Sequence, residues 1–305
     1  MLVICESLLI VSHTAELAIS APAGSAQEGR LSWWKAGVVV ALVCWLYSGV
    51  ISHLASQWWH DPNFSHGFFV PAFSAYVVWL RRDQLAIMRQ RPAWTGLGVL
   101  VAGIGLLVIG NLGAELFLSR LSLLVVMAGL VILFLGWEFQ RALLFPWLFL
   151  ILMIPIPAIL FNQITFPLQL LASKLASGLL PVLGVPVLRE GNIIQIPAMP
   201  LEVAEACSGI RSLLSLTTLA IIYGYLLESR NLIRWILALA SIPIAVAANS
   251  LRIVGTGLVV QYWDPEKGEG FFHAFSGWLI FVVSLLMLFL VHKALRFSRS
   301  EGKTK

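Results

Sequence analysis

Apolar residues run through this chain in long continuous blocks that are separated by short polar breaks. A membrane crossing takes about 20 helical residues, and lipid leaves backbone polar groups no partner outside a helix or a closed barrel. The blocks are too long and too uniformly apolar for the alternating strands of a barrel. The pattern therefore predicts an all-α fold, a polytopic helical bundle in a membrane.

Cutting the sequence at its polar breaks predicts about eight transmembrane helices. They span residues 35–54, 66–80, 94–112, 117–136, 141–160, 209–227, 235–260 and 271–291. A ninth stretch, from Phe166 to Leu180, carries Ser173, Lys174 and Ser177 among leucines and is interrupted by prolines at both ends. We expect this stretch to form an interfacial or re-entrant helix that does not cross the membrane.

The pattern assigns residues 31–295 to one transmembrane domain. Residues 1–30 are mixed in character and lack the basic n-region of a signal peptide, so we expect a loosely ordered cytosolic tail. Residues 296–305 are expected to form a second, basic cytosolic tail. Composition agrees with the membrane class, because 59% of the 305 residues are hydrophobic and only 11% are charged.

The Lys and Arg residues predict an orientation, because cytosolic loops are enriched in them. With eight crossings, fourteen of the twenty fall on one side: Arg30, Lys35, Arg81, Arg82, Arg89, Arg91, Arg141, Arg230, Arg234, Lys293, Arg296, Arg299, Lys303 and Lys305. The connections that hold few, and are expected to face out, lie around 52–65, 111–116, 161–203 and 261–270. Both termini are therefore predicted to be cytosolic. The formal charge of +5 favours contact with an anionic inner leaflet and gives no reason to expect nucleic-acid binding.

Candidate chemistry begins at Cys207, where a polar, Pro-rich stretch gives way to an apolar helix. The other two cysteines, Cys5 and Cys44, are not spaced from it as a metal or redox pair. A lone Cys is often a small buried hydrophobe, but a thiol at a helix N-terminus is favoured as the thiolate by the helix dipole. Arg211, four residues on, shares its helical face and would stabilise the thiolate further.

Two more ionisable residues lie toward the same membrane edge in the next two apolar segments. Arg252 is placed deep enough that it should face the bundle interior or a watery cavity, although it could be a structural residue paired with Glu202 or Glu205. His273 opens the last span and could equally be an ordinary boundary residue. Together with Cys207, the guanidinium and the imidazole suggest a cysteine enzyme at the boundary of water and lipid.

Several motifs resemble, in order, the signatures of the exosortases, multi-spanning cysteine transpeptidases or proteases of exopolysaccharide-producing bacteria. They are Asp61-Pro62-Asn63-Phe64-Ser65-His66-Gly67 followed by Pro71 and Arg81, Gly191-Asn192-Ile193-Ile194, Ala206-Cys207-Ser208-Gly209-Ile210-Arg211, Asn249-Ser250-Leu251-Arg252-Ile253, and His273-Ala274-Phe275-Ser276-Gly277-Trp278. The resemblance covers most of the chain. This sequence ends about fifteen residues after its last predicted span, where some exosortases carry a further soluble domain. The resemblance therefore does not identify the exosortase subtype.

The resemblance implies a catalytic site of Cys207, Arg252 and His273 in the bacterial inner membrane, facing the periplasm. Its expected partners are membrane-tethered proteins with a PEP-CTERM signal, that is, a Pro-Glu-Pro motif, a transmembrane helix and a basic cluster. The enzyme would cut near the Pro-Glu-Pro through a sortase-like acyl-enzyme, without a metal or other cofactor.

The chemistry assigns Cys207 as nucleophile, His273 as general acid and base, and Arg252 as stabiliser of the oxyanion or thiolate. Arg211 could share or exchange that last role. Asn249 belongs to the motif around Arg252 and is a supporting candidate. His66 could line the substrate groove or merely pack its loop, and Glu205 could bind a basic group or hold an Arg.

Two other classes of function fit the same residues. In a transporter of an anionic or lipid-linked substrate, Arg252 and Arg211 would bind the anion and Cys207 would be incidental. In a noncatalytic membrane scaffold, the motifs would serve helix packing. Replacing Cys207 by Ser distinguishes these classes, because it should abolish only the activity of a protease.

Overall fold

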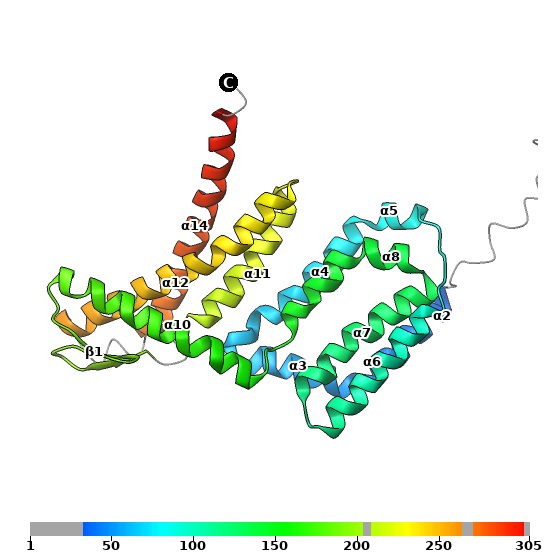
Figure 1. The fold of residues 1–305 in the computed structure, drawn as a ribbon, viewed down its shortest axis with the longest axis horizontal. Helices are drawn as coiled ribbons and strands as arrows, with labels where there is room; N and C mark the ends of the chain where they lie inside the picture. The colour runs from blue at the N-terminus through cyan, green and yellow to red at the C-terminus, as the bar shows by residue number, and fades with distance from the viewer. Residues whose placement is uncertain (1–32, 204–208, 264–270, 302–305) are drawn as a thin grey trace, which may run out of the picture.

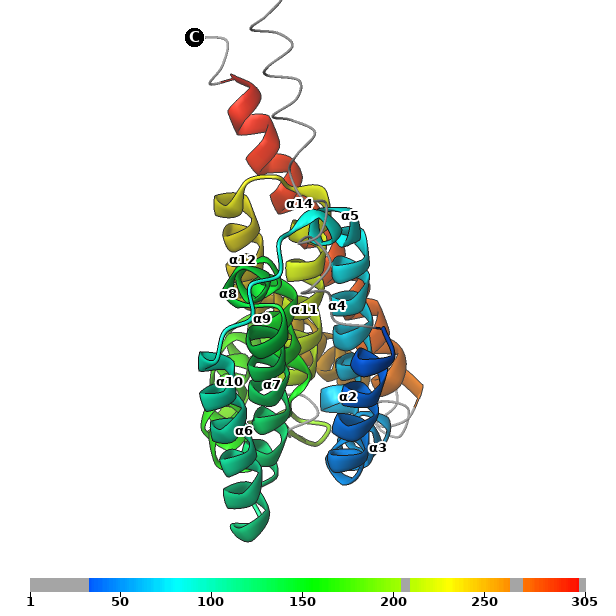
Figure 2. The ribbon, with the colours of Figure 1, turned by 90° about the vertical axis from the view of Figure 1, so that its right-hand side faces the viewer.

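The computed structural model describes residues 33–203, 209–263 and 271–301, with the backbone alone at 33, 271–276 and 298–301. The described residues form two neighbouring groups of helices (Figure 1). The first group consists of α2 (Trp33–Leu46), α3 (Ser48–His60), η1 (Pro62–Phe68), α4 (Phe69–Leu80), α5 (Arg82–Ile87), α6 (Thr95–Leu112), α7 (Leu116–Phe134), α8 (Trp137–Ala142), α9 (Leu144–Phe149) and η2 (Leu150–Met153). Figure 2 shows α6 and α7 on one side of this group and α2, α3 and α4 on the other.

The second group contains the remaining helices and a small sheet. It consists of α10 (Ala158–Leu179), η3 (Pro181–Leu183), β1 (Leu188–Glu190), β2 (Ile193–Gln195), β3 (Pro200–Glu202), α11 (Ile210–Leu227), α12 (Asn231–Tyr262) and α14 (Phe271–Glu301). Helices α11, α12 and α14 share a hydrophobic core that includes Leu216, Leu237 and Leu288.

Among the described residues, six helices are long and apolar enough to cross a membrane: Thr95–Leu112, Leu116–Phe134, Ala158–Leu183, Ile210–Leu227, Asn231–Tyr262 and Gly277–Phe297. A seventh crossing results if α2 and α3, which are bent by 67° at their break, count as one span. The predicted class, an all-α polytopic membrane protein, is thus confirmed. The predicted count of eight is not reproduced.

The difference in count arises where predicted spans are broken or short. The span 35–54 is interrupted between α2 and α3, and the span 66–80 starts in η1, which leaves α4 with only 12 residues. The span 141–160 is divided among α8, α9, η2 and the start of α10, with residues 154–157 outside any helix. Hydropathy reports preference for lipid and does not register a break in the helical hydrogen bonds, such as prolines cause.

The stretch expected to be interfacial belongs to α10, a single helix of 22 residues that contains Pro167. It is long and apolar enough for a crossing, yet it lies crosswise to α11 and α14 in Figure 1. Ala176 and Leu180 near its end share a core with Val254 of α12. Helix α10 therefore supports the C-terminal half of α12.

A three-stranded antiparallel sheet, in the order β1-β2-β3, follows α10 and was not predicted from the sequence. Ile194 in the central strand pairs with Arg189 on one side and Leu201 on the other, and its side chain is fully buried in the core shared with α10 and α12. Strands of three residues are too short to show an alternating pattern. The sheet and α10 together cover one end of α12.

Helices α6 and α7 approach each other closely through glycines that recur every seven residues. Gly96, Gly103 and Gly110 all face α7, and a Cβ atom at Gly103 would lie 2.7 Å from a methyl carbon of Val126 and 2.9 Å from its backbone nitrogen. In a membrane, where apolar burial does not drive helices together, such small residues allow the close packing that does.

Buried Glu228 joins α11, α12 and α14 through its carboxylate and its backbone carbonyl. Oε1 of Glu228, directly after α11, lies 2.8 Å from Nε2 of His292 and 3.0 Å from Nε of Arg296, both on α14. The backbone carbonyl of Glu228 accepts a hydrogen bond from Nε of Arg234 on α12 at 2.8 Å. The Tyr223 hydroxyl lies 2.7 Å from Nδ1 of His292. These bonds fix the three helices at one end.

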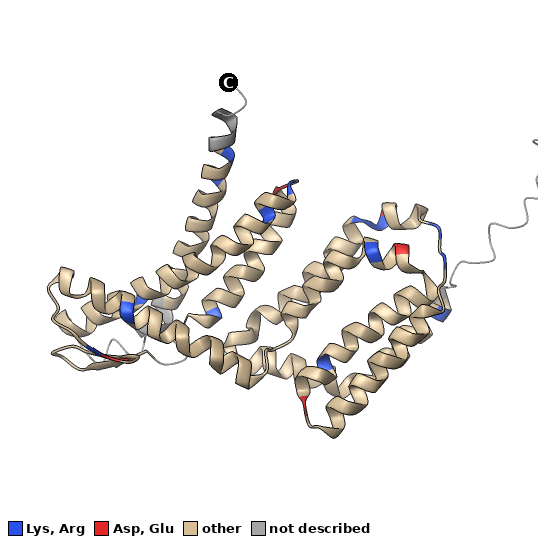
Figure 3. Ribbon diagram, viewed as in Figure 1, with Lys and Arg blue, Asp and Glu red and all other residues tan. Residues whose placement is uncertain are grey.

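Basic side chains concentrate at that same end of the molecule. Figure 3 shows Lys and Arg where α4 meets α5, on α8, between α11 and α12, and toward the end of α14. The members of the predicted basic side on these elements are Arg81, Arg82, Arg141, Arg230, Arg234, Lys293 and Arg296. Of the others whose side chains are described, Lys35 lies on α2, and Arg89 and Arg91 lie between α5 and α6. The helices thus have one strongly basic end.

Gly103→Ala should destabilise the protein by about 1–3 kcal/mol, because the new methyl group would meet Val126 and push α6 away from α7. Gly105→Ala is the matched control, since a Cβ atom there has no neighbour within 4 Å among the described residues and alanine favours the helix. Thermal unfolding in detergent should give a lower Tm for the first variant alone. Equal Tm values would contradict the close packing.

Acid should weaken the contact at Glu228. The hydrogen bond with His292, assisted by Arg296, outweighs burial and holds the pKa of Glu228 below its ordinary value of 4.5. A carboxyl whose pKa is lowered by folding stabilises the fold above its unfolded pKa, and that stabilisation disappears as the pH falls through the folded pKa. The Tm difference between wild type and Glu228→Gln should therefore be large near pH 7 and shrink below about pH 4.5.

The exposed Glu138, which pairs with Arg91, provides the control for this measurement. Glu138→Gln should change the Tm little at either pH, because exposed ion pairs contribute about 0–1 kcal/mol. A difference between wild type and Glu228→Gln that stays constant with pH would show that the charge of Glu228 is not what holds the helices.

Candidate functional site

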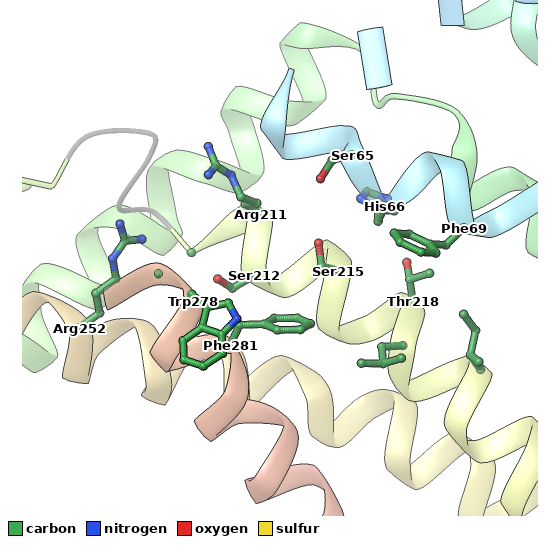
Figure 4. A pocket seen from close by; sticks show the side chains of 14 residues that line it. Ser65, His66, Phe69, Arg211, Ser212, Ser215, Thr218, Arg252, Trp278 and Phe281 are labelled. Carbon is green, nitrogen blue, oxygen red and sulfur yellow. The ribbon is translucent and has the colours of Figure 1, made fainter. Parts of the chain in front are cut away.

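A pocket of about 760 Å³ runs along α11 to Ile222 from Gly209, which is at the end of this helix opposite to the Glu228 contact. Its volume falls within the range of roughly 300–1,000 Å³ that is typical of ligand sites. Figure 4 shows the lining side chains, which come from η1, α4, α11, α12 and α14. They are Ser65, His66, Phe69, Gly209, Arg211, Ser212, Ser215, Thr218, Leu219, Ile222, Arg252, Gly277, Trp278 and Phe281.

The start of α11 is held by a close backbone approach to α12. Gly209 has a φ of +78°, and a Cβ atom there would lie 2.9 Å from the side-chain carbonyl carbon of Asn249. Only glycine meets both requirements without strain. Asn249, a supporting residue in the sequence prediction, is itself buried on α12. Its contact with Gly209 fixes where the chain enters α11.

The start of α11 also packs against two aromatic rings, one from η1 and one from α10. Ile210, the first residue of α11, shares a small core with Phe64 of η1 and Phe161 of α10. The two phenylalanine rings lie 5.7 Å apart. Three segments that are distant in sequence thus meet beside the pocket, and η1 is held against α11.

Two guanidinium groups belong to the pocket. Arg211, in the first turn of α11, is exposed, and Arg252 on α12 is half-buried. Figure 4 shows both at the same end of the pocket, pointing in a similar direction. A Cβ atom built on Gly277 of α14 would lie 3.9 Å from Cζ of Arg252, so the guanidinium lies close to the first turns of α14. Two guanidinium groups therefore line this end of the pocket.

His66 enters the pocket from η1 and is only 7% exposed. Its Nε2 lies 3.2 Å from the carbonyl oxygen of Leu152, so the loop-packing role that the sequence left open is present in the structure. Nδ1 is buried and has no hydrogen-bond partner among the described residues. The ring therefore packs η1 and lines the pocket at once.

A family model for the transmembrane exosortases matches residues 58–290. The chain belongs to the transmembrane exosortase family. The match includes every residue that lines the pocket. No curated protein and no solved structure matches the chain.

The residues predicted as the exosortase site are distributed as follows. Cys207 and Glu205 lie outside the described residues, between Val203 and Gly209. Arg252 lines the pocket, and His273 lies in the first turn of α14, four residues before Gly277. The catalytic roles of these residues stay predictions.

The supporting candidates Arg211 and His66 also line the pocket, and Asn249 lies behind it at Gly209. Among the described residues, no group of three His, Cys, Asp or Glu side chains is arranged to hold a metal ion.

Sequence reasoning missed the polar row that α11 presents to the pocket. Ser212, Ser215 and Thr218 recur at three-residue intervals and lie on the lining face (Figure 4). The spacing was visible in the sequence, but Ser and Thr in an apolar helix commonly bond to their own backbone carbonyls and are not specific signals. Trp278 and Phe281 add an apolar wall from α14.

Proposed function

We propose that this exosortase is a cysteine-type peptidase or transpeptidase of the bacterial inner membrane. Its substrates are exported proteins that carry a PEP-CTERM signal, and it cleaves this signal at the periplasmic face in a sorting step associated with exopolysaccharide. The observation that carries the proposal is the pocket at the start of α11, which Arg211 and Arg252 line. Gly209, another lining residue, follows Cys207 by two positions in the sequence.

The proposed reaction has two steps. The Cys207 thiolate attacks the carbonyl carbon of the scissile peptide bond, and the carbon–nitrogen bond breaks while the His273 imidazolium gives its proton to the leaving amine. The resulting thioester is then attacked by water or by an acceptor amine, with His273 taking the proton of the attacking group. The enzyme thus regains its starting protonation state.

Arg252 suits the stabilisation of the negative charge in this reaction. A guanidinium is charged at all relevant pH values, and a fixed donor aimed at the developing oxyanion contributes more in a site with little water. The guanidinium lies against α14 one helical turn after His273 in the sequence, which supports the assignment of both residues to one site. Arg211 stands at the same end of the pocket and could share the role.

The basic ends of the helices support the proposed orientation of the protein in the membrane. If these ends face the cytosol, as Lys- and Arg-rich loops do, both termini are cytosolic and the pocket at the opposite end faces the periplasm. Exported substrates could reach it there.

A transporter of an anionic or lipid-linked substrate is the second candidate. The observation that favours it is the pair of guanidinium groups in a cavity large enough for a small ligand. In that case the segment of Cys207 would have no covalent role, and the two functions differ in their dependence on the thiol.

Co-expression with a substrate tests the nucleophile. The substrate carries a Pro-Glu-Pro motif, an apolar span and a basic tail, and immunoblotting measures its length. Wild type should give a shortened product and Cys207→Ala only the full-length protein. Arg252→Gln should slow processing by about 10²–10³-fold, the effect of losing one oxyanion donor.

Arg189→Gln is the matched control for charge, because Arg189 is exposed on β1 and does not line the pocket. It should leave processing unchanged. Equal processing by wild type and Cys207→Ala would overturn the peptidase assignment and leave the transporter.

Reporter fusions test the orientation. Fusions after Arg91 and after Arg234 should report a cytosolic location, because both follow basic connections. Fusions within 61–65 and within 264–270 should report a periplasmic location. A cytosolic result for 264–270 would put the start of α14 on the wrong side for exported substrates.

A further inference from the structure

A second cavity, of about 470 Å³, lies in the first group of helices. It is bounded by the bend between α2 and α3, by the end of α6 and by the start of α7. Its polar lining consists of His53, Asn111, Ser119 and Arg120. None of these residues belongs to the pocket beside α11.

Arg120 is the unusual member of this cavity. Its side chain sits in the second turn of α7 and the residue is only 4% exposed. Among the described residues it forms no hydrogen bond or ion pair, and its buried Nε has no partner. The nearest acidic residue in sequence, Glu115, accepts a hydrogen bond from the backbone of Phe117.

An uncompensated guanidinium at such a position is energetically costly. Charged groups within membrane helices ordinarily pair with a counter-charge or face water, because the lipid core solvates them poorly. A buried charge without a partner is destabilising compared with an apolar residue of similar size. Arg120, unpaired among the described residues, should therefore lower the stability of the fold, and a bound anion would offset this loss.

We propose that Arg120 binds the phosphate group of an anionic ligand in this cavity. A guanidinium presents several donors in a planar fork that matches phosphate oxygens. The rim favours a phospholipid as the source, because Leu46 of α2 and Leu116 of α7 line the cavity and are exposed. Acyl chains could lie along these side chains while the headgroup reaches Arg120.

The bend between α2 and α3 creates the space. Tyr47 stands at the bend, fully buried, and its hydroxyl lies 3.0 Å from Oγ of Ser122 on α7. Ser122 in turn donates to the carbonyl oxygen of Ser119 at 2.7 Å. On the cavity side of the bend, a Cβ atom at Gly49 would meet none of the described residues within 4 Å. The anchor at Tyr47 thus fixes the bend against α7 beside the cavity.

Thermal unfolding in a neutral detergent tests the site. The probes are dioleoyl phosphatidic acid, dioleoylglycerol, which has the same chains without phosphate, and sodium phosphate matched in ionic strength with sodium chloride. At about a hundredfold excess over Kd, a bound ligand should raise the Tm of the wild type by about 5 °C. Dioleoylglycerol should have no such effect.

Two variants separate the cavity from the remaining basic surface. Arg120→Met removes the charge at similar length, and Gly49→Leu fills the cavity without altering Arg120. Both should lose the Tm rise. Gly98→Leu on α6 is the control, since a Cβ atom there also meets none of the described residues within 4 Å but does not line the cavity, and this variant should keep the rise.

The pattern of responses decides the ligand. A rise with phosphatidic acid alone identifies a lipid phosphate, and a rise with sodium phosphate as well identifies a soluble anion in the same site. Equal responses of wild type, Arg120→Met and Gly49→Leu would overturn the proposal. If Arg120→Met does not fold, the comparison of Gly49→Leu with Gly98→Leu decides: equal Tm rises in these two variants would overturn the proposal by themselves.

Discussion

The buried residue Glu228 fixes the three helices on which the candidate site depends. It contacts α14 through His292 and Arg296, and its backbone contacts α12 through Arg234. Lipid supplies no hydrophobic force between helices, so polar contacts and close packing decide how they associate. The contacts at the basic ends, together with the core of Leu216, Leu237 and Leu288 along these helices, set the positions of α11 and α14 where they line the pocket.

The sequence predicted the helices that are continuous and failed where continuity is lost. Long apolar blocks correctly gave α6, α7, α11, α12 and α14, since a lipid-exposed helix needs apolar side chains all round. The same blocks concealed the bend at Tyr47 and the breaks before Pro155, because these depend on contacts with other helices or on missing backbone donors. Helix α10 illustrates the limit: its length and composition permit a crossing, whereas its crosswise position depends on the sheet and α12.

For the site, sequence motifs brought together residues that no periodicity could have joined. Arg211, Arg252 and His66 come from three separate elements and line one pocket. Asn249 was predicted only as a neighbour of Arg252, and the structure gives it a physical task, which is to pack against Gly209. The polar row of α11, formed by Ser212, Ser215 and Thr218, and the burial of Arg120 were not predicted from the sequence. Both depend on which way a side chain faces, and this is decided by tertiary packing.

Placing the pocket at helix ends has a consequence for the choice of substrate under the proposed function. A guanidinium near the centre of a bilayer costs about 2.5–3.5 kcal/mol on insertion scales, whereas near the interface it can reach water. Under the proposed function, Arg211 in the first turn of α11 would lie at the depth of a peptide bond just outside the bilayer, and Arg252 would reach the same end of the pocket from within α12. A substrate tethered by its own transmembrane helix arrives at that depth already oriented, which avoids much of the entropy loss of a bimolecular encounter. The tether would then supply much of the selectivity, and the pocket would need to recognise only a short motif.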